Sequence, residues 1–102
     1  MNTPLQPEKL QVIQNLAESR FEIHLGDAIA VLDYQEQGDD IVMLHVGVPL
    51  EFRGQGIAAL ITQAGLDYAK QKSLRVIPLC SYVAAYLRRT SQVTKLNRSK
   101  ET

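Results

Sequence analysis

Val46-Gly47-Val48-Pro49-Leu50-Glu51-Phe52-Arg53-Gly54-Gln55-Gly56-Ile57-Ala58 is the stretch that decides the fold. An apolar run ends at Pro49, two glycines follow, and a helical pattern begins at Ile57. In such a strand–loop–helix junction, backbone N–H groups around Gly54 and Gly56 can converge on an anion at the helix N-terminus. The alternative is a strand-to-helix turn that uses glycine only for its permissive backbone dihedrals. The spacing alone does not separate these two interpretations, because short glycine motifs are weak evidence.

After the junction the pattern takes a helical period. The apolar side chains form one face of an amphipathic helix, at Ile57, Leu60, Ile61, Ala64 and Tyr68, and the polar ones take the opposite face, at Thr62, Gln63, Asp67, Lys70 and Gln71. Residues 74–79 read as a strand, in which Pro78 marks an edge, a bulge or a strand end because it has no N–H. Since a helix separates this strand from the one before the loop, the two should be parallel with a right-handed crossover. Residues 82–89 predict a short second helix.

Before the junction, short apolar runs alternate with turns. Residues 20–25 alternate in polarity, and the runs at 28–34 and 41–48 follow turn signals at Gly26-Asp27 and at residues 37–40. These runs predict an antiparallel meander. Because the last two runs are apolar on both faces, we expect central strands covered on two sides. Residues 10–14 fit a helix or a strand, and we favour a strand because residues 17–19 have the length of a hairpin loop.

The sequence therefore predicts a compact α/β (α+β) fold with a mixed sheet: an antiparallel meander, then a parallel βαβ crossover with helices packed on the sheet. The 102 residues suffice for one domain, with an ordered core at about residues 10–90. We expect residues 1–9 to be loosely attached and the residues after Thr90 to form a polar, basic tail.

Composition and charge limit the class of protein. No apolar run has the roughly 20 residues of a membrane span, the N-terminus lacks the features of a signal peptide, and the single cysteine, Cys80, cannot form an internal disulfide. We therefore expect a cytoplasmic protein with no membrane partner and, with only two histidines, no metal site. Nine of the eleven acidic residues lie in residues 1–51 and nine of the eleven basic residues in residues 52–102, so the glycine loop opens a basic half that would attract a polyanion. Nucleic acid is not an expected partner, because the basic residues are scattered and not interleaved with aromatics.

A meander whose last strand leads into V-P-x-x-x-R-G-x-G-I-A and an amphipathic helix resembles the acetyl-CoA site of the GNAT superfamily of N-acetyltransferases. Arg53, Gly56 and Ala58 match the superfamily consensus R/Q-x-x-G-x-G/A. The chain is most similar to the branch of very small, NATD1-like proteins, through residues 45–49 (HVGVP) and residues 77–83 (IPLCSYV). The resemblance extends from about residue 21 to residue 87.

The resemblance implies an acetyl-CoA-dependent N-acetyltransferase that acts on a primary amine, with acetyl-CoA (coenzyme A) as the cofactor. The backbone N–H groups of the loop would hold the pyrophosphate of the cofactor, at Arg53, Gly54, Gln55, Gly56, Ile57 and Ala58. The pantetheine arm would lie along Val46 and Val48. The side chain of Arg53 would either reach a phosphate or remain a surface charge.

The same resemblance makes His45, Cys80 and Tyr86 the candidate catalytic residues. His45 would be the base for direct attack by the amine, although a lone histidine on an apolar strand is more often a core residue. Cys80 would carry the acetyl group in an alternative route, or would be only a small core side chain. Direct transfer needs one step fewer and is the default. Tyr82 or Tyr86 would protonate the departing thiolate, unless both belong to the core.

Larger members of the superfamily have a further strand pair and a helical region that shape the acceptor pocket, and this chain has neither pattern. The acceptor side should therefore be open. That favours a peptide or protein amine as acceptor, or a homodimer that completes the site. The main alternative is a CoA- or acyl-CoA-binding module with little or no transferase activity, and a small regulatory or interaction domain is a third interpretation.

Overall fold

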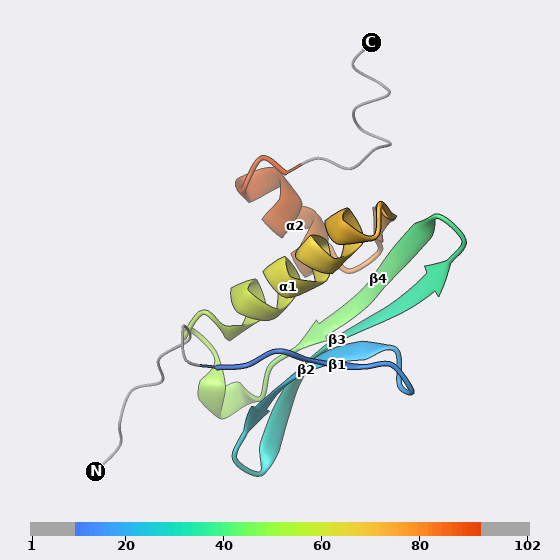
Figure 1. The fold of residues 1–102 in the computed structure, drawn as a ribbon. Helices are drawn as coiled ribbons and strands as arrows, with labels where there is room; N and C mark the ends of the chain where they lie inside the picture. Colours follow the sequence, from blue (N-terminus) through green and yellow to red (C-terminus); the bar gives the residue numbers. More distant parts are fainter. Residues whose placement is uncertain (1–9, 93–102) are drawn as a thin grey trace.

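Five strands form one mixed sheet in the order β1-β2-β3-β4-β5, and two helices pack against it (Figure 1). The strands are β1 (Ile13–Asn15), β2 (Arg20–Leu25), β3 (Ala28–Gln37), β4 (Asp40–Gly47) and β5 (Arg75–Pro78). The two α-helices are α1 (Ile57–Gln71) and α2 (Ser81–Arg89), and a short 3-10 helix, η2 (Leu50–Phe52), lies in the loop between β4 and α1. This computed structural model describes residues 10–92, so the expectations for residues 1–9 and for nearly all of the basic tail lie outside the described residues.

The first four strands form the predicted antiparallel meander. Residues 13–15 are a strand, which confirms the interpretation that we favoured for the N-terminal run. The hairpins turn at Gly26 and Gly38, whose positive φ angles of 68° and 59° are unfavourable for other residues. Between β3 and β4 the register shifts: Asp33 pairs with His45 but Tyr34 pairs with Met43, so β4 has an extra residue in a β-bulge.

The crossover from β4 through α1 to β5 is also as predicted. β5 lies parallel to β4 at the edge of the sheet, and Pro78 is its last residue. The guanidinium of Arg75 donates two hydrogen bonds to the carboxylate of Asp40 at 2.8 and 3.0 Å, which fixes the start of this parallel pair. The α+β fold class of the sequence analysis is thus confirmed.

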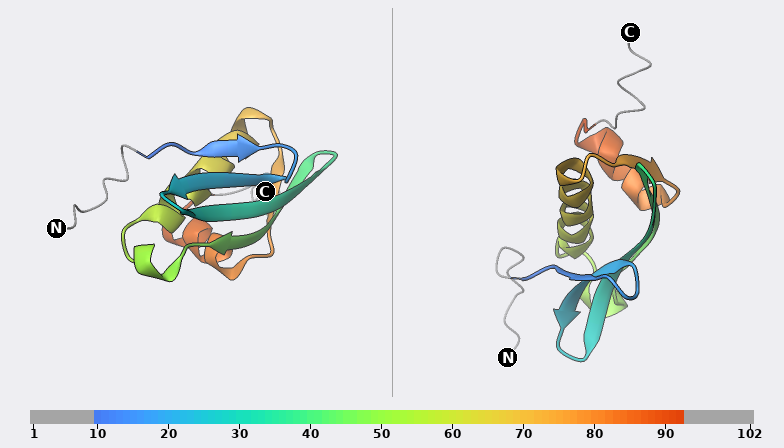
Figure 2. Two further views of the ribbon diagram at one scale, coloured as in Figure 1. Left: turned by 90° about the horizontal axis from the view of Figure 1, so that it is seen from below. Right: turned by 45° about the vertical axis from the view of Figure 1, so that its right-hand side comes forward.

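Both helices lie against the same face of the sheet, as the view in Figure 2 (left) shows with the strands in front and the helices behind. The core between the two layers contains fully buried side chains from each of them, among them Ile23, Leu32, Met43, Ile61 and Val83. The expectation that the central strands are covered on two sides is therefore wrong for the part of the chain that the structure describes. The side chains of β3 and β4 on the other face are only partly buried.

The buried stripe of α1 is rotated relative to the predicted one. Thr62, which the pattern assigns to the polar face, is fully buried, and Gly65 and Leu66 are buried beside it. Gly65 allows the helix to approach the sheet closely, because a Cβ at this position would lie 2.5 Å from Cδ2 of Leu32. The close approach turns a different set of residues toward the sheet than hydrophobicity alone predicts.

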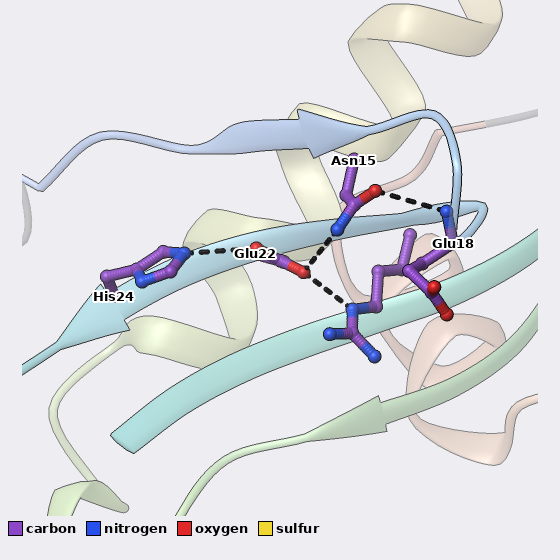
Figure 3. A network of polar contacts seen from close by, with 5 residues as sticks. Asn15, Glu18, Glu22 and His24 are labelled. Carbon is purple, nitrogen blue, oxygen red and sulfur yellow. Dashed lines mark hydrogen bonds and ion pairs between the residues drawn. The ribbon is translucent and has the colours of Figure 1, made fainter. Parts of the chain in front are cut away.

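The uncovered face of the sheet has a polar cluster centred on Glu22 of β2 (Figure 3). The Glu22 carboxylate accepts hydrogen bonds from Asn15 Nδ2 at 3.0 Å and Arg20 Nε at 2.7 Å, and it lies 3.0 Å from Nε2 of His24. These hydrogen bonds lower the pKa of Glu22 to about 2, and the one from Asn15 has the largest effect. They therefore offset the cost of burying the charged carboxylate. The cluster ties β1 to β2 and leaves Glu22 ionised at neutral pH.

Candidate functional site

The second half of β4 has a free edge on the side of β5. The parallel pairing ends at Met43 and Pro78, and the N–H of Cys80 then donates to the carbonyl of Met43 at 3.0 Å. Beyond this point the chain of β5 turns into α2, whereas β4 continues to Gly47, paired on its other side with β3. Within the described residues, no strand pairs with this edge of β4 beyond Met43. The two parallel strands thus part where the resemblance requires them to.

The loop after β4 turns the chain into α1 through two glycines in the left-handed region. Gly54 has φ 81° and Gly56, the N-cap of α1, has φ 84°. Such angles are strained for residues with a Cβ, so the dihedral explanation for the two glycines is sound in itself. A Cβ at Gly54 would also point into open space, with no atom within 4 Å. The dihedral explanation and the anion-binding explanation are therefore compatible, because the turn that needs glycine also leaves the backbone of the loop accessible.

Six consecutive backbone N–H groups, those of residues 54–59, have no hydrogen-bond acceptor within the described residues. The N-cap of α1 has no side-chain cap, so nothing from the side chains replaces the missing acceptors. No acidic residue lies in the first turn of α1 to oppose an anion. The N–H groups and the positive end of the helix dipole make this loop suitable for binding a phosphate group.

A pocket of about 730 Å³ connects the free edge of β4 to this loop. Its walls come from β3, the end of β4, the glycine loop, the first turn of α1 and the start of α2. The lining residues are Ile29, Val31, His45, Val46, Gly47, Val48, Pro49, Phe52, Arg53, Gly54, Gly56, Ile57, Ala58, Ala59 and Tyr82. Such a volume is in the range of small-molecule sites.

Most of the residues predicted to bind a cofactor line this one pocket: Val46, Val48, Arg53, Gly54, Gly56, Ile57 and Ala58. Gln55 is the exception and does not line it. Arg53 Nε donates a hydrogen bond to the carbonyl of Val48 at 3.1 Å, so the side chain spans the loop that it belongs to. This bond holds the guanidinium beside the pocket and leaves its other N–H groups free of protein partners among the described residues.

His45 lines the pocket and is exposed, not buried in the core. The interpretation as a satisfied core histidine is thus wrong, because the bulge and the uncovered sheet face leave the ring accessible. Cys80 is half-buried at the N-cap of α2 and does not line the pocket. The structure therefore brings His45, but not Cys80, to the pocket surface.

The two tyrosines of α2 have different surroundings. Tyr86 does not line the pocket: it is buried, and its hydroxyl donates to Gln63 Oε1 at 2.8 Å. Burial raises the pKa of Tyr86. Tyr82 lines the pocket and stacks on Tyr86, with ring centroids 6.2 Å apart, while the guanidinium of Arg89 lies over both rings. Of the two candidates weighed from the sequence, the structure places Tyr82 at the pocket.

Ile29 and Val31 of β3 are pocket residues that the sequence analysis did not single out. They alternate with buried Ala30 and Leu32, so they lie on the uncovered face. The pocket therefore reaches from the helix side of the sheet around the free edge of β4 to the uncovered face. In the sequence this run is apolar on both faces, so the pattern alone does not single out Ile29 and Val31. Only the absence of a covering layer in the described part of the structure makes them pocket residues.

None of the helices in the described part of the chain is long and apolar enough to span a membrane. Among residues 10–92, no three His, Cys, Asp or Glu side chains are grouped so as to hold a metal ion.

Comparison with known proteins identifies one family. Residues 20–96 match the family model described as GCN5-related N-acetyl-transferase. Protein NATD1 of chicken is 33% identical over 82 residues, which cover 78% of this chain and 74% of the chicken protein. Protein NATD1 of mouse and of human are each 38% identical over 60 residues, which cover 58% of this chain. The chain spans about half the length of these two relatives, with 54% and 53% of their residues covered.

Proposed function

The chain belongs to the GCN5-related N-acetyltransferase family, and on this premise we propose that it is an acetyl-CoA-dependent N-acetyltransferase that transfers an acetyl group to a primary amine. The observation that carries the proposal is one continuous surface. It runs from the free edge of β4 to the six unpaired N–H groups of the glycine loop. Both parts of this surface are hydrogen-bonding backbone without protein partners in residues 10–92.

The residues of the pocket fit the chemistry of acetyl-CoA. The N–H groups of residues 54–59 and the free N–H groups of Arg53 suit a diphosphate. A Cβ at Gly54 would extend into the open space that the diphosphate needs. The free edge of β4 at Val46 offers main-chain hydrogen bonds to the amides of the pantetheine arm, as an edge strand does to an added strand, and Val48, just after the strand, extends this edge with its N–H, since its carbonyl already accepts from Arg53.

Acetyl-CoA, when bound, supplies an acetyl group activated as a thioester. We propose that His45, which lines the pocket, accepts the proton from the attacking amine and that Tyr82, which lines it too, donates one to the departing thiolate. Because Cys80 does not line the pocket, we propose direct transfer without an acyl-cysteine. The acceptor enters from the uncovered face of the sheet, where Ile29 and Val31 extend the pocket, so a peptide or protein amine has room there.

Binding is tested by thermal unfolding with and without acetyl-CoA. At a ligand concentration of 100 times Kd we expect stabilisation by about 2.7 kcal/mol, which raises Tm by on the order of 10 °C in a domain of this size. Gly56→Glu should abolish the shift, because its side chain fills the loop. Gly38→Glu is the matched control: it places the same side chain at another glycine of positive φ, away from the pocket, and should keep the shift.

Transfer is tested by acetyl-CoA turnover with a panel of primary amines and peptides, with intact-mass measurement of the protein. We expect turnover that His45→Ala lowers strongly and Cys80→Ser does not, without an acetyl adduct on Cys80. Binding without turnover on any amine would favour a CoA- or acyl-CoA-binding module instead. The absence of any Tm shift at saturating acetyl-CoA would rule out both functions.

A further inference from the structure

Gly47 lacks the usual reasons for a glycine. Its φ is not in the left-handed region, and it is the last residue of β4, still paired with Val31 of β3, where a side chain is normally favourable. What distinguishes it is the space above it. A Cβ at this position would lie 2.9 Å from Nε2 of His45, 3.6 Å from Cδ2 of the same ring and 3.6 Å from Cγ2 of Val31. The imidazole of His45 thus lies over the backbone of Gly47, in the volume that any other residue would fill.

Asp33 faces His45 from the neighbouring strand. It pairs directly with His45 across β3 and β4, so their Cβ atoms are about 4.5–5.5 Å apart on one face of the sheet. This pair is the last one before the register shift of the bulge. Within the described residues the Asp33 carboxylate has no hydrogen bond or ion pair. It is therefore available to the imidazole.

The distances to Gly47 also orient the ring. The edge of the imidazole that carries Nε2 and Cδ2 is the one turned toward Gly47, so Nδ1 lies on the edge turned away from it. Gly47 itself lines the pocket. We infer that Gly47 and Asp33 are positioning residues that together seat the His45 imidazole. Gly47 leaves room for the ring, and the Asp33 carboxylate, which makes no hydrogen bond within residues 10–92 of this structure, accepts one from Nδ1–H when its side chain turns toward the ring.

The charged groups around the ring are consistent with this assignment. From β2, Arg20 lies beyond Asp33 in the same row, but its Nε is bound to Glu22 at 2.7 Å. Arg53 of the loop and Tyr82 of α2 share the pocket with His45. On β4 itself, Asp40 is bound by Arg75. Asp33 therefore faces His45 without a hydrogen bond or ion pair of its own in the described part of the chain, although the charge of Arg20 acts on it from the next strand.

The arrangement deepens the proposed function and rests on it. A neutral His45 with its proton on Nδ1 presents the lone pair of Nε2, which is what a base for the acceptor amine requires. The carboxylate of Asp33 then stabilises the imidazolium that forms when Nε2 takes the proton. Neither residue touches the reacting atoms in this scheme, because both act through His45.

The test is the tautomeric state of His45, read from long-range ¹H–¹⁵N NMR spectra of the ligand-free protein. Only two histidines are present, and His24, which contacts Glu22 elsewhere on the sheet, is an internal reference. We expect the Nδ1–H tautomer for His45 in the wild type. Asp33→Asn should lose it, and Gly47→Ala should shift the His45 ring resonances while those of His24 stay in place. Asp27→Asn, an exposed substitution in the β2–β3 turn, should change neither histidine.

An Asp33→Asn protein that keeps the wild-type His45 signature would overturn the role of Asp33, and unchanged His45 resonances in Gly47→Ala would overturn the role of Gly47. These readouts do not depend on activity, so they stand even if no transfer is found. With the amine that the wild type acetylates fastest, Gly47→Ala should lower kcat by about ten- to a hundredfold by displacing the base. In a His45→Ala background the same change should lower kcat no further, and an additive loss would contradict action through His45.

Discussion

Gly65→Ala should destabilise the protein, although alanine is the better helix former. In the middle of α1 the exchange favours the helix by about 1 kcal/mol. The new Cβ, however, would lie 2.5 Å from Cδ2 of Leu32 and 3.3 Å from Cε of Met43. Both side chains are fully buried, so they can move aside only by disturbing the packing around them, and overpacking of this kind costs about 1–3 kcal/mol. We expect a net loss of about 1 kcal/mol, or about 4–8 °C in Tm.

Leu32→Val decides whether this reasoning is correct, because valine has no δ carbon. In that background the main clash is gone, and Gly65→Ala should raise the free energy of unfolding by up to about 1 kcal/mol, a coupling of about 2 kcal/mol between the sites. The assay is urea unfolding of the four proteins of the cycle. The pair Lys70→Ala and Lys70→Gly, at an exposed position of α1, measures the helix-propensity contribution separately. If Gly65→Ala stabilises the wild type and the Leu32→Val protein equally, the close approach of α1 to the sheet is wrong.

Three further predictions concern single side chains. Folding lowers the pKa of Glu22 from 4.5 to about 2, so the stability that its carboxylate contributes is present above about pH 4.5 and is lost as the pH falls toward 2. Glu22→Gln should flatten this acid limb in urea midpoints measured from pH 6 to 2, and an identical limb would refute the assignment. Tyr82→Phe should lower kcat by at least a hundredfold as loss of a general acid, whereas Tyr86→Phe should leave kcat unchanged and cost about 1 kcal/mol of stability, since its hydroxyl only binds Gln63. If Tyr86→Phe lowered kcat and Tyr82→Phe did not, Tyr86 would be the general acid. Arg53→Ala should weaken acetyl-CoA binding about tenfold in calorimetry, or 1.4 kcal/mol, and an unchanged Kd would leave Arg53 a surface charge.

The sequence predicts most of the fold because its local signals agree with one another. The change of period at Ile57, directly after a glycine loop, marks the start of α1 correctly. The turn glycines at 26 and 38 mark both central hairpins. Pro78 marks the end of β5, and the intervening helix requires the parallel pairing with β4. These features depend on residues that are close together in the chain, so a sequence pattern can predict them.

The errors arise where tertiary contacts decide. The apolar residues on both faces of β3 and β4 suggest a second covering layer, but part of that face lines the pocket instead. Thr62 reads as a solvent residue, and only the close packing of α1 at Gly65 turns it inward. No local sequence pattern predicts the bulge opposite Asp33. The bulge changes the register of β4, so the pattern of this strand alone could not assign His45 to the pocket. Gln55, Cys80 and Tyr86 were predicted from a motif, and a motif does not say which of its side chains face the cavity.

An amide-resolved ¹H–¹⁵N NMR titration with acetyl-CoA tests whether the free edge of β4 and the glycine loop form one binding surface. We expect saturable shifts at the amides of Gly54, Gly56 and Ala58 together with those of Val46 and Val48, all with one Kd. The hairpin glycine Gly38, which does not line the pocket, should not respond. Shifts confined to the basic end of α2, or a spectrum that does not change at saturating acetyl-CoA, would contradict the proposed site.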